Sequence, residues 1–254
     1  MDRPSPLSRV RIVLVSPETP ANVGAAARAM KTMGLSRLVV VAPACDVHSA
    51  EAVRLAHNAE DVLANLEIVP TLDAALADVA FSAATTNRVR RAGLPFDAPE
   101  QLATRLLPIA EKQSVAIVFG RESSGLTTEE VVRCSVASTI PSATTVPALN
   151  LAQAVMVYCY ALYQASLTTA EREYEWSLAE QGEVEPLYRH LASTLERLEG
   201  RPAVSMDLWI DKFRRILARV PLERRDVALL HKFLSIADRA AVRRPSTADE
   251  RSGS

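Results

Sequence analysis

The clearest cluster of residues with types and spacing suited to chemistry is the segment 117–126, IVFGRESSGL. A short apolar run stops at Gly120, and the charged pair Arg121 and Glu122 follows at once. Stability alone does not require charge and glycine at the end of a buried strand, whereas ligands of open α/β sheets bind at the carboxyl ends of strands. The segment therefore predicts a ligand site. Arg121 and Glu122 form either an ion pair within a turn or two separate site groups.

A second segment, residues 20–31 (PANVGAAARAMK), predicts a helix that begins with Asn22 as its cap and ends near Gly34. The first turn of a helix attracts anions. Gly24, Arg28 and Lys31 fall on one stripe of this helix, at i, i+4 and i+7. The pattern indicates either a phosphate or hydroxyl clamp, with Gly24 leaving room for a ligand, or an amphipathic helix with a solvated basic face.

The third segment, residues 140–150 (IPSATTVPALN), combines prolines with the hydroxyls of Ser142, Thr144 and Thr145. Asn150 opens the helix that follows, where it is a cap, a site donor or both. We interpret the three segments as loops that face one site. No GxGxxG, GxxxxGK[ST] or GxSxG pattern is present, and the cysteines lack metal-ligand spacing, so the sequence predicts no metal.

The elements that position these loops alternate between strands and helices, which predicts an α/β fold with a mostly parallel sheet covered on both faces. A helix over 149–165 is apolar almost all round, so either the core or a second subunit buries it. We favour a subunit interface for one face. Strands are expected at residues 10–15, 38–41, 67–69, 79–84, 115–119 and 136–140.

The chain divides into a domain over residues 1–166, a polar linker over 167–182, an all-helical extension over 183–242 and a disordered tail over 243–254. In the extension, Ser205 is expected to cap a helix with Met206, Trp209, Phe213 and Ile216 on its apolar face. The net charge of −1 offers no overall attraction for nucleic acid, so any such surface must be local. Because the sequence shows neither a signal peptide nor a long enough apolar stretch, we expect a cytoplasmic protein without membrane contact.

The three loops resemble the three motifs of the SPOUT-class RNA 2′-O-ribose methyltransferases. Residues 22–35 resemble the first motif, 118–126 the second and 140–154 the third. The resemblance implies a C-terminal trefoil knot in the domain, an obligate homodimer with active sites shared across its interface, and S-adenosylmethionine held by the knot loops. It implies a catalytic group of Asn22, Arg28, Glu122 and Asn150, in which Arg28 stabilises developing oxyanion charge and Glu122 orients its neighbours. It also implies cofactor contacts from Thr85, Thr86, Gly120, Ile140, Ser142 and Leu149.

Within this class the chain most resembles the bacterial tRNA methyltransferases that act on cytidine or uridine 32 of the anticodon loop. The resemblance rests on residues 28–35 (RAMKTMGL), on Thr85-Thr86 followed by arginines, and on the helical extension. It implies tRNA as the partner. The side chains expected to contact tRNA are Lys31, Arg88, Arg90, Arg214, Arg215 and Arg219.

One residue departs from the family pattern. The third motif usually reads Ser-Leu-Asn, and here Ala148 replaces the serine. Either Ser142 or Thr145 supplies the missing hydroxyl, or the chain is a non-catalytic RNA-binding protein on the same fold. Two further alternatives are an rRNA methyltransferase of the same class and a nucleotide-binding α/β protein without methyl chemistry.

Overall fold

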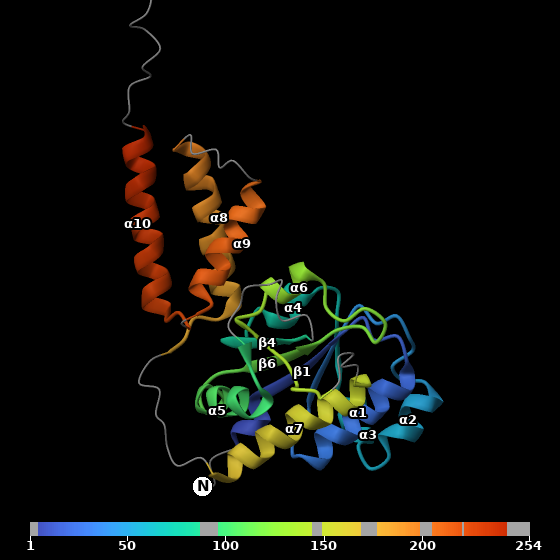
Figure 1. Cartoon of the computed structure of the whole chain (residues 1–254). Helices are drawn as coiled ribbons and strands as arrows, with labels where there is room; N and C mark the ends of the chain where they lie inside the picture. Colours follow the sequence, from blue (N-terminus) through green and yellow to red (C-terminus); the bar gives the residue numbers. More distant parts are fainter. Residues whose placement is uncertain are drawn as a thin grey trace, which may run out of the picture.

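The computed structural model describes residues 5–86, 96–143, 149–168, 177–198, 205–219 and 221–242. Its centre is a parallel seven-stranded sheet in the order β3-β2-β1-β6-β4-β7-β5, with helices on both faces (Figure 1). The α/β fold class is therefore confirmed, while the trefoil knot stays a prediction. The strands are β1 (Val10–Val15), β2 (Arg37–Val41), β3 (Glu67–Val69), β4 (Phe81–Thr85), β5 (Phe96–Asp97), β6 (Val115–Phe119) and β7 (Val136–Ser138).

Helices cover the two faces of the sheet unequally. Strand β1 is buried along its whole length because Ile12 and Leu14 pack into the core on one face and Val13 and Val15 into the core on the other. The face of Ile12 carries most of the helices, whereas α4 and α6 cover the opposite face. The helices of this domain are η1 (Pro6–Arg9), α1 (Pro20–Thr32), α2 (Ala50–Ala56), α3 (Glu60–Ala64), α4 (Leu72–Leu76), α5 (Pro99–Ala110), α6 (Thr128–Val132) and α7 (Leu151–Thr168).

Helix α1 corrects two sequence predictions. It begins at Pro20, a residue favoured in the first helical position, so Thr19 occupies the cap position and Asn22 lies inside the first turn. A Cβ atom at Gly24 would lie 2.1 Å from the carbonyl oxygen of Ala52 in α2. Gly24 is therefore needed for α1 and α2 to pack together and does not leave room for a ligand. The expected end is confirmed, since Gly34 has a φ of +76°.

Helix α7 is buried on one side only within a single chain. Val155, Tyr158 and Leu162 pack into the core against the sheet, while Tyr160 and Leu167 are exposed. The alternative in which the domain core surrounds this helix is therefore wrong for the single chain. Its exposed apolar side remains consistent with a subunit interface.

The extension consists of α8 (Gln181–Arg197), α9 (Met206–Leu217) and α10 (Arg224–Val242), which stand on the side of the sheet covered by α4 and α6 (Figure 1). Helix α8 begins inside the segment expected to be a linker. Its first two N–H groups donate to the domain, Gln181 to the Val79 carbonyl at 2.7 Å and Gly182 to the Ala77 carbonyl at 2.9 Å. The extension is thus attached to the domain by backbone hydrogen bonds at its first helix.

Helix α9 packs on a different face from the one expected. Ile210 and Arg214 point inward, whereas Ile216 is exposed. The Arg214 guanidinium lies 4.3 Å above the ring of Tyr188 and forms a bidentate ion pair with Glu185. With only 9% of its surface exposed, Arg214 is not available to a phosphate, so its predicted role in RNA binding is wrong.

Candidate active site

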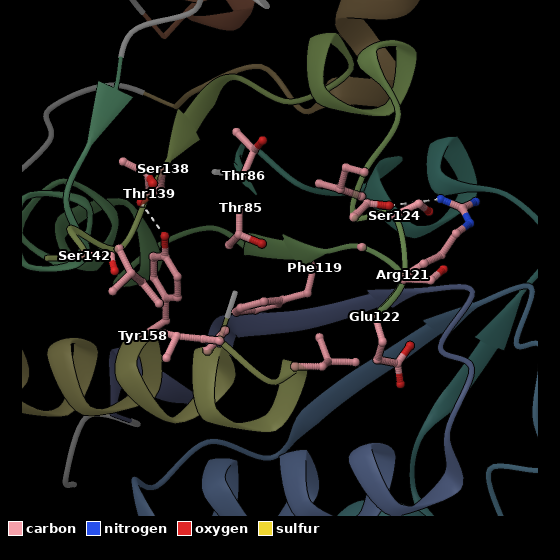
Figure 2. A pocket seen from close by; sticks show the side chains of 18 of the residues that line it. Thr85, Thr86, Phe119, Arg121, Glu122, Ser124, Ser138, Thr139, Ser142 and Tyr158 are labelled. Carbon is pink, nitrogen blue, oxygen red and sulfur yellow. Dashed lines mark hydrogen bonds between the residues drawn. The ribbon is translucent and has the colours of Figure 1, made fainter. Parts of the chain in front are cut away.

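A cavity of about 390 Å³ opens at the carboxyl ends of the adjacent strands β4, β6 and β7 (Figure 2). The three parallel strands end at the same edge, which brings together loops that are far apart in the sequence. All six residues expected to contact the cofactor line this cavity, and that role stays a prediction. They are Thr85, Thr86, Gly120, Ile140, Ser142 and Leu149.

The loop after β6 forms one wall of the cavity by folding back on itself. Gly125 N–H donates to the Arg121 carbonyl at 2.8 Å, and Arg121 N–H donates to the Gly125 carbonyl at 3.3 Å. A Cβ atom at Gly120 would lie 2.2 Å from both the carbonyl carbon of Gly125 and the nitrogen of Leu126. Gly125 has a φ of +70°, which favours glycine. Gly120 therefore allows the close backbone packing of this wall, and Gly125 favours its turn.

Arg121 and Glu122 are separate groups, which resolves the alternatives left open by the sequence. Their side chains point to opposite sides of the loop (Figure 2). Arg121 makes two hydrogen bonds of 3.0 Å to the Glu130 carboxylate of α6, and this pairing raises the pKa of Arg121. Arg121 therefore fixes the loop to α6 and leaves Glu122 to the site.

Glu122, Asn22 and Asn150 form one hydrogen-bonded chain across three loops. The Asn22 side-chain N–H donates to Glu122 Oε1 at 2.9 Å, and the Asn150 side-chain N–H donates to Asn22 Oδ1 at 2.8 Å. Asn150 Oδ1 also accepts the Ala152 backbone N–H at 2.9 Å, so Asn150 caps α7 and contacts the site at once. The structure thus joins three of the four residues expected to be catalytic.

The environment of Glu122 keeps its carboxylate ionised. Burial acts to raise the pKa of Glu122, but hydrogen bonds from Asn22 and from the backbone N–H groups of Glu18 and Thr19 outweigh it and lower the pKa. The carboxylate occupies the start of α1, where the sequence predicted an anion site for a phosphate. That prediction is corrected, because an anion of the chain itself fills the position.

The floor of the cavity contains residues that sequence reasoning missed. The Tyr158 hydroxyl donates to Ser138 Oγ at 2.8 Å, and the Ser138 hydroxyl donates to the Asp97 carbonyl at 2.7 Å. The Phe119 and Tyr158 rings meet edge to face at 5.5 Å, and burial raises the pKa of Tyr158 to about 12. Helical spacing is the signal that could have found Tyr158, since it follows Leu151 and Ala154 on the stripe of α7 that lines the cavity.

The remaining predicted site residues lie elsewhere. Arg28 is exposed on α1 and is not among the described residues that line the cavity. Lys31 forms an ion pair with Asp61 of α3. Arg215 on α9 is partly exposed, and Arg219, which follows the end of α9, is exposed. Arg88, Arg90, Thr145 and Ala148 lie outside the described residues.

This geometry suits a ligand with a flat apolar part and several polar groups. Phe119, Ile140 and Leu149 offer apolar walls, and Thr85, Thr86 and Ser142 offer hydroxyls beside backbone N–H and carbonyl groups. An ionised carboxylate and two oriented amides stand beside this pocket. Such a site can hold a nucleoside-like cofactor and position a second, polar reactant next to it.

The fold and the pocket suit the class of RNA methyltransferases that use S-adenosylmethionine as the methyl donor, and the comparisons with known proteins identify that class. A model of the SpoU rRNA methylase family matches residues 9–160. The chain belongs to this family. No helix in the described part of the chain has the length and apolarity needed to cross a membrane.

Similar proteins cover almost the whole chain. A protein of Escherichia coli strain K12 named uncharacterized tRNA/rRNA methyltransferase LasT is 37% identical over 89% of this chain and 96% of its own length. The tRNA (cytidine/uridine/adenosine-2′-O-)-methyltransferase TrmJ of Pseudomonas aeruginosa strain UCBPP-PA14 is 39% identical over 78% of this chain and 89% of its own length. The crystal structure of TrmJ from Z. mobilis ZM4 superposes with a TM-score of 0.77 at 31% identity, and covers 89% of this chain and 97% of that one.

Proposed function

We propose that the protein transfers a methyl group from S-adenosylmethionine to a ribose 2′-oxygen of tRNA in the cytoplasm, at cytidine or uridine 32 of the anticodon loop. The observation that carries this proposal is the hydrogen-bonded chain Glu122–Asn22–Asn150 beside the cavity at the ends of β4, β6 and β7. The TrmJ relative of Pseudomonas aeruginosa, whose name specifies 2′-O-methylation of tRNA, supports the choice of substrate.

The cavity residues fit this cofactor. Bound there, S-adenosylmethionine would supply an electrophilic methyl group on a sulfonium. Leu149, Ile140, Thr85 and Ser142 line the cavity and would hold the cofactor, and Gly120 leaves the backbone of its loop open to close contact. The apolar floor of Phe119 and Tyr158 excludes water from the inner end of the site.

The protein groups next to the cavity position the acceptor. A ribose 2′-hydroxyl is a weak acid, and a carboxylate with a lowered pKa is a weak base, so Glu122 orients its neighbours instead of taking the proton. Each side-chain amide has two N–H donors, and one N–H of Asn22 and one of Asn150 is used within the chain of hydrogen bonds. The second N–H of each amide can hold the ribose in line with the methyl group, and such alignment supplies much of a rate enhancement.

Arg28 has a role in this proposal only if a second copy of the chain takes part. Its guanidinium is exposed and outside the cavity of its own chain, and the apolar side of α7 is exposed as well. In a homodimer, Arg28 of one copy would reach the cavity of the other. There it would stabilise the charge that develops on the 2′-oxygen, an effect of about 10²-fold or more in turnover.

Mixed dimers test this arrangement. A dimer of one Arg28→Ala copy and one Gly120→Ala copy retains one complete site if Arg28 acts across the interface, and none if it acts within its own chain. We expect the mixed dimer to methylate tRNA although each parent homodimer does not. An inactive mixed dimer would reject the shared site.

Mapping of 2′-O-methyl groups in tRNA and rRNA, from cells with and without the gene, tests the substrate. We expect loss of methylation at tRNA position 32 alone. Loss at another tRNA position would correct the target nucleotide. Loss in rRNA would favour the second candidate, which the tRNA/rRNA wording of the LasT name motivates.

A further inference from the structure

The outer face of α10 carries a stripe of large apolar side chains without a partner in the chain. Leu229, Phe233 and Ile236 stand at i, i+4 and i+7 and are 65%, 70% and 58% exposed. The opposite face of α10 packs on α8 and α9 through Val227, Leu230 and Leu234. The helix stands at the edge of the molecule, so solvent borders the stripe along its length (Figure 1). Aligned exposed apolar residues of this kind mark interaction sites.

The charge beside this stripe is of one sign. The exposed face of α10 carries Lys232 and Arg239 next to Phe233 and Ile236, and none of the exposed residues in the described part of α10 is acidic. The two acidic residues of the helix are only partly exposed, and Asp226 accepts the Glu223 backbone N–H at the start of the helix. Asp238 pairs with His190 and Arg197 of α8. We call the set Leu229, Lys232, Phe233, Ile236 and Arg239 the outer face of α10.

We propose that the outer face of α10 binds the RNA substrate, with an unpaired base stacked on Phe233 and phosphates held by Lys232 and Arg239. This proposal rests on the proposed function, which supplies an RNA with an open loop. Aromatic side chains beside cations are the usual means by which proteins hold unpaired nucleotides. The burial of Arg214 removes a central cation from the face of α9 expected to bind RNA, whereas the cations on the outer face of α10 are exposed.

A second copy of the chain fits this face less well. A symmetric pair of α10 helices would bring the same cations of both copies together around the apolar stripe, where like charges repel. A polyanion has the complementary charge along the full length of the face. Charge complementarity therefore selects RNA over self-association.

Two matched pairs of variants test the proposal in the full-length protein, with an unmodified tRNA transcript as the probe. Phe233→Trp keeps a ring that can stack, whereas Phe233→Leu keeps apolar contact but removes the ring. Lys232→Arg keeps the charge, whereas Lys232→Glu reverses it. We expect Phe233→Leu to weaken tRNA binding about tenfold, the scale of losing one stacked base, and Phe233→Trp to bind within about twofold of wild type.

The salt dependence of binding gives an independent readout. Lys232→Glu should weaken binding and reduce the slope of log K against log salt concentration by about one, while Lys232→Arg should keep the slope. Calorimetry with S-adenosylmethionine should give wild-type affinity for all four variants, because the side chains are exposed and far along the chain from the cavity loops.

The outcomes separate this proposal from the proposed function. Wild-type tRNA affinity in both Phe233→Leu and Lys232→Glu would overturn the surface even if the protein methylates tRNA. If these variants bind tRNA more weakly but the wild-type protein transfers no methyl group to tRNA, the RNA-binding surface is supported and the proposed methyltransferase activity is rejected. Sedimentation tests whether the outer face of α10 binds a second copy of the chain. A change of oligomeric state in Phe233→Leu, with unchanged tRNA affinity, would assign the face to self-association.

Discussion

The methyltransferase domain and the helical extension achieve their structures by different means. In the domain, strand β1 is buried from end to end and helices press on both faces of the sheet. In the described part of the extension, the buried apolar residues reduce to Leu187, Tyr188, Ile210 and Val227, and ion pairs such as Arg214–Glu185 join the helices. Hydrophobic burial dominates stability. The domain can therefore hold a precise pocket, while the extension presents apolar and charged side chains to a partner.

The sharpest test of the domain lies in the cavity loop. Gly120→Ala places a Cβ atom 2.2 Å from the backbone of Gly125 and Leu126, so the loop must move. We expect the free energy of unfolding to fall by about 3 kcal/mol, the scale of severe overpacking, and S-adenosylmethionine binding to be lost by calorimetry.

Gly125→Ala is the matched control in the same loop. Its Cβ atom meets no atom within 4 Å, so only the φ of +70° opposes the substitution. We expect a cost of about 1 kcal/mol, typical of alanine in the left-handed region, with cofactor binding retained. Equal effects of the two substitutions would show that close packing does not shape the cavity.

The extension should respond most strongly to loss of its buried arginine. Arg214→Leu removes the guanidinium above Tyr188 and leaves the Glu185 carboxylate with Arg133 as its remaining ion-pair partner. We expect the free energy of unfolding of the extension to fall by about 2 kcal/mol, since one partner of a largely buried pair is removed.

Urea unfolding measures this change by tryptophan fluorescence, with Trp176 replaced by Phe in every variant so that Trp209 on α9 is the emitting residue. Arg219→Leu provides the control, because Arg219 is exposed and should change stability by less than about 0.5 kcal/mol. An Arg214→Leu protein as stable as the control would show that Arg214 is not a structural residue.

A change of pH should have a smaller effect on the stability of the extension. His190 and His231 join α8 to α10 through a 2.8 Å contact between their Nδ1 atoms. His190 also contacts Asp238, which forms an ion pair with Arg197. Burial, and then the neighbouring His190, lower the pKa of His231. The unfolded chain therefore binds this proton more readily than the folded chain, and stability falls as the pH drops below about 6.5.

We expect the extension to lose less than about 1 kcal/mol between pH 8 and pH 5.5, since one weakly shifted group is involved. The lowered pKa of Asp238 contributes only at more acidic pH, near the ordinary range of carboxylates. Urea unfolding at the two pH values measures the change, and His231→Gln should remove it. A stability that rises toward pH 5.5 would contradict the assignment.

Sequence reasoning succeeded where local pattern decides the structure. Strands β1, β3 and β6 begin and end at the predicted residues, because apolar runs bounded by turn residues specify buried elements. The loop 120–126 was also found, since a strand that ends in glycine and charge marks a site in a parallel sheet, whereas Thr85 and Thr86 were expected from the family resemblance.

The sequence predictions failed where residues far away in the sequence determine the local structure. The start of α1 is satisfied by Glu122, which lies about a hundred positions later, so Asn22 is free of the capping role and joins the site. The inward face of α9 is set by Glu185 and Tyr188 of α8 and not by its own apolar periodicity. Neither partnership can be read from the local sequence.

The most direct test of the account is methyl transfer by the purified protein to an unmodified tRNA transcript, with S-adenosylmethionine labelled in its methyl group. We predict that label appears as a 2′-O-methylribose at nucleotide 32 with the wild-type protein and is absent with Gly120→Ala. Label on a base, or no label in tRNA with a wild-type protein that binds the cofactor, would contradict the account.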